Sequence, residues 1–241
     1  MEIKIKNTSK DVILHGVKCA IYGESGVGKT RLLATAPKPL IISTEHGLLS
    51  LRDKNIPYVE IETVHDVQEV YDWITESKEA NQYQTIAMDG ISELAELLLL
   101  ELKPTVKDKR NAYGDTADSV GTMLRNFRDL KGPNVVFTAK MRKMEDEDLG
   151  ITYFVPLLPG KVLPQGLPYL VDEVFCMQIH EEGTYGQDDY QRYSYLQTFN
   201  TSKIVAKDRS GCLDEYEYPG DGDDIPNLTV LFNKIKKGIV K

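Results

Sequence analysis

The first 139 residues alternate short apolar runs with stretches in which apolar residues recur every three or four positions. Continuous apolar runs are typical of parallel strands buried on both faces, and the three-and-four spacing is typical of amphipathic helices. Strands are expected over residues 17–22, 39–44, 56–61, 85–89 and 134–139. Helices are expected over 30–36, 91–103 and 118–130, with one more beginning at Thr63 or His65. This alternation predicts an α/β protein with a mostly parallel central sheet flanked by helices.

The pattern changes after residue 139, where strand-like runs dominate. They cover residues 150–156, 171–180, 190–199 and 202–207, and a final helix is expected over 227–237. The polar segment 107–116 contains a glycine and is interpreted as a mobile connection. We therefore expect a single domain over residues 1–241. It has an N-terminal segment (1–15) and a mainly β extension (140–241) that continues the sheet antiparallel and ends in the helix.

A glycine-rich segment between the first expected strand and the first expected helix reads Gly-Glu-Ser-Gly-Val-Gly-Lys-Thr. Glycines permit backbone angles that turn successive N–H groups inward around phosphate oxygens. The lysine reaches the β- and γ-phosphates and the threonine hydroxyl completes a Mg²⁺ shell. The alternative is a glycine-rich turn that binds no phosphate, which the position between a strand and a helix disfavours. The pattern predicts binding of ATP and Mg²⁺ by Gly23, Glu24, Ser25, Gly26, Val27, Gly28, Lys29, Thr30 and Arg31.

Two carboxylates stand at the ends of expected strands. Asp89 ends an apolar run and fits an aspartate that holds Mg²⁺ through water, so Thr30 and Asp89 are the expected metal residues. Asp89 could instead cap the helix that starts near Ile91. Glu45 follows the second expected strand, within one water of the γ-phosphate, and fits a general base. The alternative for Glu45 is a solvated loop glutamate.

The order of these motifs resembles the RecA-type ATPase core. The resemblance rests on the phosphate loop, Thr44-Glu45-His46, Asp89-Gly90-Ile91-Ser92 and the run Phe137-Thr138-Ala139-Lys140-Met141-Arg142. It implies that Glu45 is the catalytic glutamate at the end of the second strand. It also places Lys140 at the position that senses the γ-phosphate, where bacterial recombinases have a glutamine.

Late in the chain, Val205-Ala206-Lys207-Asp208-Arg209 resembles the recombinase strand whose basic residues contact the γ-phosphate of the neighbouring subunit. The resemblance implies that Lys207 and Arg209 act in trans. Such residues neutralise the charge that develops on the transferred phosphoryl group. A pair of solvated charges at a strand end is the alternative.

Over residues 15 to 235 the chain is similar to a family of compact phage RecA-like nucleotide-binding proteins, also called ATP-dependent single-strand annealing proteins. Besides its small size, it shares Ser43-Thr44-Glu45-His46-Gly47, the segment 157–171 before Asp172-Glu173-Val174, and the run from Ala206 to Gly211. The resemblance implies rings or filaments of the chain, binding of single-stranded DNA, annealing or strand exchange, and a single-strand-binding protein as a further partner. DNA contacts are expected from Arg142 and Lys143, and from Lys161 within a flexible stretch over 157–166. The acidic run 145–148 opposes DNA, and an ordinary surface loop is the alternative.

Composition limits these readings. The net charge of −8 argues against indiscriminate binding of nucleic acid. No apolar run is long enough to span a bilayer or to serve as a signal peptide, and the three cysteines lack metal-ligand spacing, so a cytoplasmic protein is expected, in the bacterial host if phage-encoded. No Asn-Lys-x-Asp signature of GTPases occurs, which favours ATP. The expected activity is weak, DNA-dependent ATP hydrolysis. The alternatives are a nucleotide-gated interaction module with negligible turnover and a small-molecule or nucleotide kinase.

Overall fold

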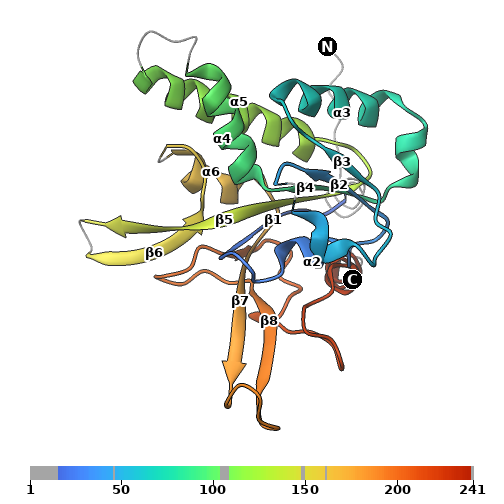
Figure 1. Ribbon diagram of the computed structural model, residues 1–241, viewed down its shortest axis with the longest axis vertical. Coiled ribbons are helices and arrows are strands. Elements are labelled where there is room, and N and C mark those ends of the chain that lie inside the picture. Colours follow the sequence, from blue (N-terminus) through green and yellow to red (C-terminus); the bar gives the residue numbers. More distant parts are fainter. Residues whose placement is uncertain (1–15, 46, 104–108, 148–149, 161, 240–241) are drawn as a thin grey trace.

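The computed structural model describes residues 16–45, 47–103, 109–147, 150–160 and 162–239. Its central feature is a single twisted sheet with the strand order β10-β8-β7-β1-β5-β4-β2-β3 (Figure 1). The strands from β7 to β3 in this order run parallel, and β8 and β10 continue the sheet antiparallel. The expected fold class is therefore confirmed. The path consists of β1 (Lys18–Gly23), β2 (Pro39–Ser43), β3 (Tyr58–Glu60), β4 (Thr85–Asp89), β5 (Asn134–Asp146), β7 (Glu173–Glu182), β8 (Gln191–Gln197) and β10 (Tyr216–Glu217).

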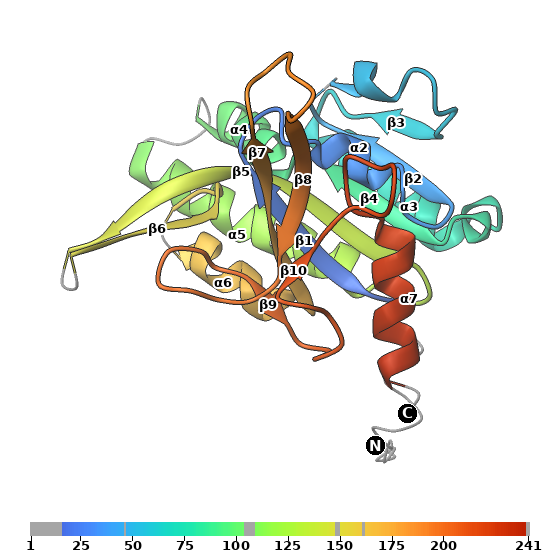
Figure 2. The ribbon, with the colours of Figure 1, turned by 90° about the horizontal axis from the view of Figure 1, so that it is seen from below.

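Helices cover both faces of the sheet and enclose two separate apolar clusters. One face carries α3 (Val64–Glu76), α4 (Ile91–Leu102), α5 (Lys109–Arg128) and α6 (Val162–Leu170). The other carries α2 (Lys29–Leu33) and α7 (Leu228–Ile239), and Figure 2 shows α7 beside the sheet. No helix in the described part of the chain is both long and apolar enough to cross a membrane.

Two helical segments differ from the expectation. Helix α5 begins at Lys109, so most of the segment interpreted as a mobile connection (107–116) is helical; residues 104–108 lie outside the described part. Helix α6 covers the second half of the stretch expected to be flexible (157–166), and its Leu163 and Leu167 are buried four residues apart. Pro164 fits because the first turn of a helix needs no N–H donor there. Local sequence does not predict this helix, because it contains two prolines and a glycine.

Strand β5 is longer than expected and leaves the sheet. Lys140 is its last residue paired with β1, and from Met141 onward β5 pairs antiparallel with β6 (Ile151–Pro156). We call this projecting pair the β5–β6 arm; it comprises residues 141–147 and 150–156 and extends to the left in Figure 1. The expected strand over 202–207 is reduced to a bridge at Ile204 and to β9 (Lys207–Asp208), which pairs with β7.

The first residue of β7 makes stability depend on pH. Glu173 is 1% exposed, and burial together with Asp208 raises its pKa from 4.5 to about 8. Between these values the folded chain keeps a proton that the unfolded chain releases, so stability falls as pH rises from 4.5 to 8. We expect Glu173→Gln to flatten this decline, by on the order of a few kcal/mol at pH 8. Urea unfolding at several pH values measures the free energy of unfolding of both proteins. The same dependence of this free energy on pH in the wild type and in Glu173→Gln would contradict the prediction.

Candidate nucleotide-binding site

The glycine-rich loop joins β1 to α2, as the sequence predicts. Gly28 caps α2 in the left-handed region with a φ of 98°, and Gly26 has a φ of 80°. A Cβ on Gly23 would lie 2.5 Å from the carbonyl oxygen of Met177 in β7. No atom lies within 4 Å of a Cβ built on Gly26, so the loop faces open space there. The glycines are thus required by backbone conformation and by contact with β7, and the loop keeps room in front of it.

Lys29 lies across the inner side of this loop. Its Nζ donates to the carbonyl oxygens of Gly23 (2.9 Å) and Glu24 (2.7 Å). Burial lowers the pKa of Lys29, and the carboxylates of Glu45 and Asp89 oppose this shift. The ammonium is therefore held at the loop by the backbone. Phosphate oxygens can take over its hydrogen bonds.

The Asp89 carboxylate connects the end of the phosphate loop to the neighbouring strand β5. Its Oδ2 accepts a 2.8 Å hydrogen bond from Thr30 Oγ1, and its Oδ1 accepts a 2.6 Å bond from Thr138 Oγ1 on β5. The residue before helix α4 is Gly90, and the helix start has no side-chain cap. The helix-cap alternative for Asp89 is therefore wrong. Its carboxylate is turned to the phosphate loop instead.

The two residues expected to bind Mg²⁺, Thr30 and Asp89, fit this ion. Their oxygens are in contact, and Ser43, in register with Asp89 on β2, has a buried hydroxyl with no partner among the described residues. No group of three or more His, Cys, Asp and Glu side chains able to hold a metal occurs in the described part of the chain. Mg²⁺ commonly keeps several waters and takes its other ligands from one or two carboxylates and from phosphates. Such an ion would neutralise phosphate charge here.

Glu45 is placed beside Asp89 by its neighbours. Thr44 Oγ1 bonds to the carbonyl oxygens of Asp89 (2.9 Å) and Gly90 (2.8 Å), which fixes the end of β2 against the start of α4. A Cβ on Gly90 would lie 2.5 Å from Glu45 Cγ, so the glutamate stem lies directly over this glycine. Although Glu45 is exposed, the partial burial of its carboxyl and then Asp89 raise its pKa, against the effect of Lys140 and Lys29. Its neighbour His46 lies outside the described residues.

Lys140 lies at the same edge of the sheet, in register with Gly23. Its Nζ pairs with Glu93 on α4 and lies 3.9 Å from Glu96, and the bond to Glu93 raises its pKa. Lys140, the predicted γ-phosphate sensor, is therefore held by Glu93 of α4. To contact a γ-phosphate, its amine must leave Glu93.

Comparisons with known proteins agree with this site. A family model described as an AAA domain matches residues 15–210. The chain belongs to this AAA domain family. Membership indicates a P-loop domain of the ATPase type that binds nucleotide. No curated protein matches the chain. Among solved structures it is similar to a KaiC-like protein of the hyperthermophilic archaeon Pyrococcus horikoshii OT3, with 11% identity, a TM-score of 0.36 and coverage of 78% of this chain and 83% of that one.

Lys207 and Arg209 lie away from the phosphate loop of their own AAA domain. Lys207 pairs with Val174, which is in register with Ala20, three residues before the loop begins. Its Nζ donates to the carbonyl oxygens of Val171 (2.6 Å) and Pro168, at the end of α6. Arg209 forms a 2.9 Å ion pair with Asp172. Both cations are engaged within the chain, and their action in trans stays a prediction.

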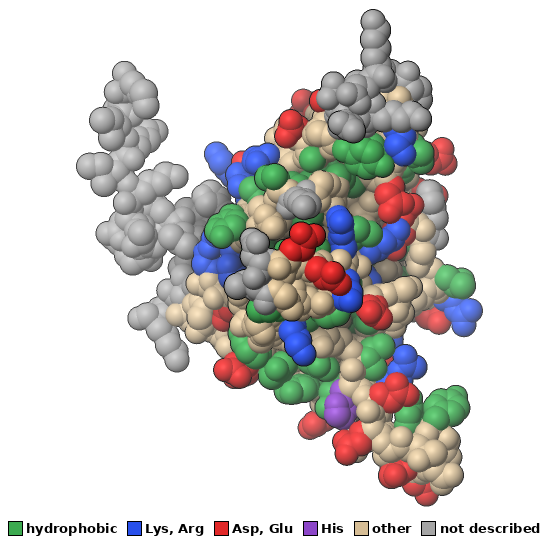
Figure 3. Space-filling view, turned by 90° about the vertical axis from the view of Figure 1, so that its left-hand side faces the viewer, with side chains coloured by type: hydrophobic (Ala, Val, Ile, Leu, Met, Phe, Trp, Pro, Cys, Tyr) green, Lys and Arg blue, Asp and Glu red, His purple; other side chains and the backbone are tan. Residues whose placement is uncertain are grey.

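The predicted DNA contacts lie on a strand and not in a loop. Arg142 and Lys143 are on the β5–β6 arm, opposite Val155 and Phe154, and Lys143 forms a 3.5 Å ion pair with Glu145. Lys161 lies outside the described residues. On the face of the AAA domain shown in Figure 3, basic and acidic side chains are interspersed. DNA binding by Arg142 and Lys143 stays a prediction.

Three side chains at or near the phosphate loop were not predicted from the sequence as site residues: Thr138, Ser194 and Asp224. Thr138 was visible as a polar residue in an apolar strand, but its bond to Asp89 was not. Ser194 Oγ donates to the Val27 carbonyl oxygen (2.7 Å), and Asp224 forms two bonds to Arg31 (2.6 and 2.7 Å). No local signal marks Ser194 or Asp224, because their partners are more than 160 positions away.

Gly90 supplies a test of the site's packing. It has a φ of 97°, and an added Cβ would clash with Glu45 and Thr44, whereas Gly132 has a φ of 106° with no atom within 4 Å of its Cβ position. We expect Gly132→Ala to cost about 1–2 kcal/mol for the backbone alone. Gly90→Ala should cost more and should also slow hydrolysis by displacing Glu45. Thermal unfolding and turnover measure both, and equal effects of the two substitutions would contradict the packing role.

Proposed function

We propose that this AAA domain binds and hydrolyses ATP and binds single-stranded DNA in phage DNA recombination, by strand annealing or exchange, with ATP held at an interface between subunits. One observation carries the hydrolytic part. Glu45 lies over Gly90 beside Asp89, within electrostatic reach of Lys29 and Lys140. A carboxylate in that place is suited to accept a proton from water that attacks the γ-phosphate.

Each group at the site has a task in this proposal. The loop N–H groups and Lys29 bind the phosphates, while Thr30 and Asp89 hold Mg²⁺, which supplies charge neutralisation when bound. Glu45 orients the attacking water and takes its proton. The raised pKa of Glu45 brings it closer to neutral pH, where a general base works best. Lys140, released from Glu93, contacts the γ-phosphate oxygens.

Interface ATP is supported by the placement of Lys207 and Arg209. In their own chain Lys207 bonds carbonyl oxygens at the end of α6 and Arg209 pairs with Asp172, so we assign their role at ATP to a neighbouring copy. If they act in trans, Glu45→Gln and Arg209→Ala proteins should each be inactive and should regain turnover when mixed. Arg128→Ala, which removes a comparable surface pair with Asp129, is the control and should behave like the wild type. Failure of the mixture to recover activity would rule out the trans arrangement.

The DNA-binding part is supported by the resemblance to phage annealing proteins and by the β5–β6 arm, which presents Arg142 and Lys143 away from the core. Cations on a projecting strand can contact phosphates while the net charge of −8 suppresses nonspecific binding elsewhere. A single-strand-binding protein is a proposed further partner in the host cytoplasm.

The deciding experiment is steady-state ATP hydrolysis across protein concentration, with and without a single-stranded oligonucleotide. A rate per protomer that rises with protein concentration and with DNA supports the proposal. Annealing of complementary oligonucleotides, monitored by fluorescence quenching, tests the proposed strand-annealing activity. A slow rate that responds to neither variable would reject it.

A nucleotide-gated interaction module is the second candidate. It is favoured by the engaged state of three cations: Lys140 on Glu93, Lys207 on α6 and Arg209 on Asp172. Under this reading ATP stabilises a subunit interface without being turned over. Nucleotide-dependent assembly with no phosphate release would support it over the recombination protein.

A further inference from the structure

The segment that leads into α7 contacts helix α2, which carries Lys29 and Thr30. Asp224 pairs with Arg31 in the first turn of this helix, at 2.6 and 2.7 Å. Leu228 N–H donates to Thr35 Oγ1 (2.8 Å) and Thr229 Oγ1 donates to the Thr35 carbonyl oxygen (2.7 Å), just beyond the end of α2. We call residues 224–229 the C-terminal strap. It lies beyond residues 15–210, which the family model matches.

The strap and β8 meet the phosphate loop at one place. The Ser194 N–H donates to the Asp224 carbonyl oxygen (2.8 Å), and Ser194 Oγ donates to the Val27 carbonyl oxygen (2.7 Å). Ile225 Cγ2 lies 3.4 Å from the Cβ position of Gly28 and packs into the apolar cluster on the α2 face. The loop is therefore held by a hydrogen bond, by an apolar contact and, through Arg31, by an ion pair.

The position of this contact relative to the catalytic groups matters. Asp89 and Lys140 belong to β4 and β5, and Glu45 follows the end of β2, all on one side of β1, whereas Ser194 belongs to β8, on the other side. The contact thus supports the loop from the side opposite the predicted γ-phosphate chemistry. It can set the direction of the loop N–H groups without touching the reacting atoms.

We propose that Ser194 and Asp224 are positioning residues for the phosphate loop, and that the C-terminal strap and the bound nucleotide stabilise each other. The inference rests on nucleotide binding at this loop. Preorganised donors bind an anion more tightly than mobile ones because no ordering cost is added on binding. By linkage, a nucleotide that selects the ordered loop must also favour the docked strap.

The test measures affinity for Mg-ATP by fluorescence titration with a labelled ATP analogue. Ser194→Ala removes the bond to Val27, and Asp224→Asn weakens the pair with Arg31. Each should weaken binding roughly 3- to 10-fold, the value of one hydrogen bond. Ser194→Thr keeps the hydroxyl and should restore most of the affinity.

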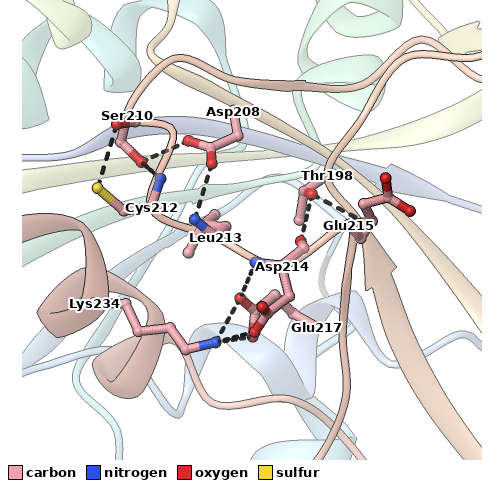
Figure 4. A network of polar contacts seen from close by, with 9 residues as sticks. All are labelled: Thr198, Asp208, Ser210, Cys212, Leu213, Asp214, Glu215, Glu217 and Lys234. Atoms are coloured by element: carbon pink, nitrogen blue, oxygen red, sulfur yellow. Dashed lines mark hydrogen bonds and ion pairs between the residues drawn. The ribbon is translucent and has the colours of Figure 1, made fainter. Parts of the chain in front are cut away.

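A matched control exists in the same part of the chain. Lys234 on α7 forms ion pairs with Asp214 and Glu217, both at 2.8 Å, in the network of Figure 4. This network anchors α7 to the segment before the strap, and Lys234 bonds Asp214 and Glu217 instead of the phosphate loop. Lys234→Met should lower thermal stability and leave the affinity for Mg-ATP unchanged.

A second readout separates positioning from plain stability. Hydrogen exchange of strap amides should slow when Mg-ATP binds the wild-type protein, and Ser194→Ala should lose most of this response. Unchanged affinity in both Ser194→Ala and Asp224→Asn, or strap exchange indifferent to nucleotide, would overturn the inference. If Ser194→Ala does not fold, the more exposed Asp224→Asn decides. A wild-type protein that binds no Mg-ATP would overturn nucleotide binding itself, whereas indifference to DNA would reject only the recombination function.

Discussion

Replacing Glu45 with glutamine should reduce ATP hydrolysis by at least about 10²-fold, the usual contribution of a general base. Affinity for Mg-ATP should stay close to that of the wild type, because glutamine keeps the shape of the side chain over Gly90 and removes only the proton acceptor. A small gain in affinity is the expected deviation, since one negative charge beside the phosphates is lost. Phosphate release and nucleotide titration on the same preparation measure the two effects.

The matched control for this substitution is Glu96→Gln. Glu96 is also on α4, but its carboxylate makes only a weak contact with Lys140: Oε1 lies 3.9 Å from Nζ, which bonds Glu93 instead. It should change turnover only slightly. If Glu45→Gln hydrolyses ATP as fast as the wild type, Glu45 is not the base, and the nucleotide-gated module becomes the better reading.

Lys29→Met should weaken ATP binding by roughly 100-fold or more, since it removes the half-buried cation predicted to contact phosphate oxygens and keeps the approximate length of the side chain. Lys29 also bonds two loop carbonyl oxygens, those of Gly23 and Glu24, so the variant should loosen the loop. Stability without nucleotide should fall much less than affinity. Titration with Mg-ATP and thermal unfolding in its absence measure the two.

Lys143→Met makes the same charge change on the β5–β6 arm, where Lys143 pairs with Glu145. It should leave ATP affinity unchanged and weaken binding to single-stranded DNA. An equal loss of ATP affinity in both variants would mean that net charge, and not contact by Lys29, governs nucleotide binding.

The phosphate loop, Asp89 and the parallel sheet could be predicted because their signals are local. Gly26 and Gly28 need positive φ, so the backbone itself demands glycine there. Strand β4 was predicted with its observed bounds because a continuous apolar run ends in a carboxylate. The arm could not be predicted in the same way: residues 141–146 carry mixed charges, and only pairing with β6 makes them a strand.

Local sequence was enough to predict a P-loop domain and to place Lys29, Thr30 and Asp89 at the expected nucleotide site, since backbone geometry and burial periodicity are encoded within short segments. Tertiary structure decided the rest. Ser194 and Asp224 reach the loop region only because β8 and the C-terminal strap pack next to β7 and α2. Lys207 turned inward because the end of α6 offers carbonyl oxygens beside β9. Such contacts depend on which surfaces the folded sheet brings together, and no spacing along the chain records that.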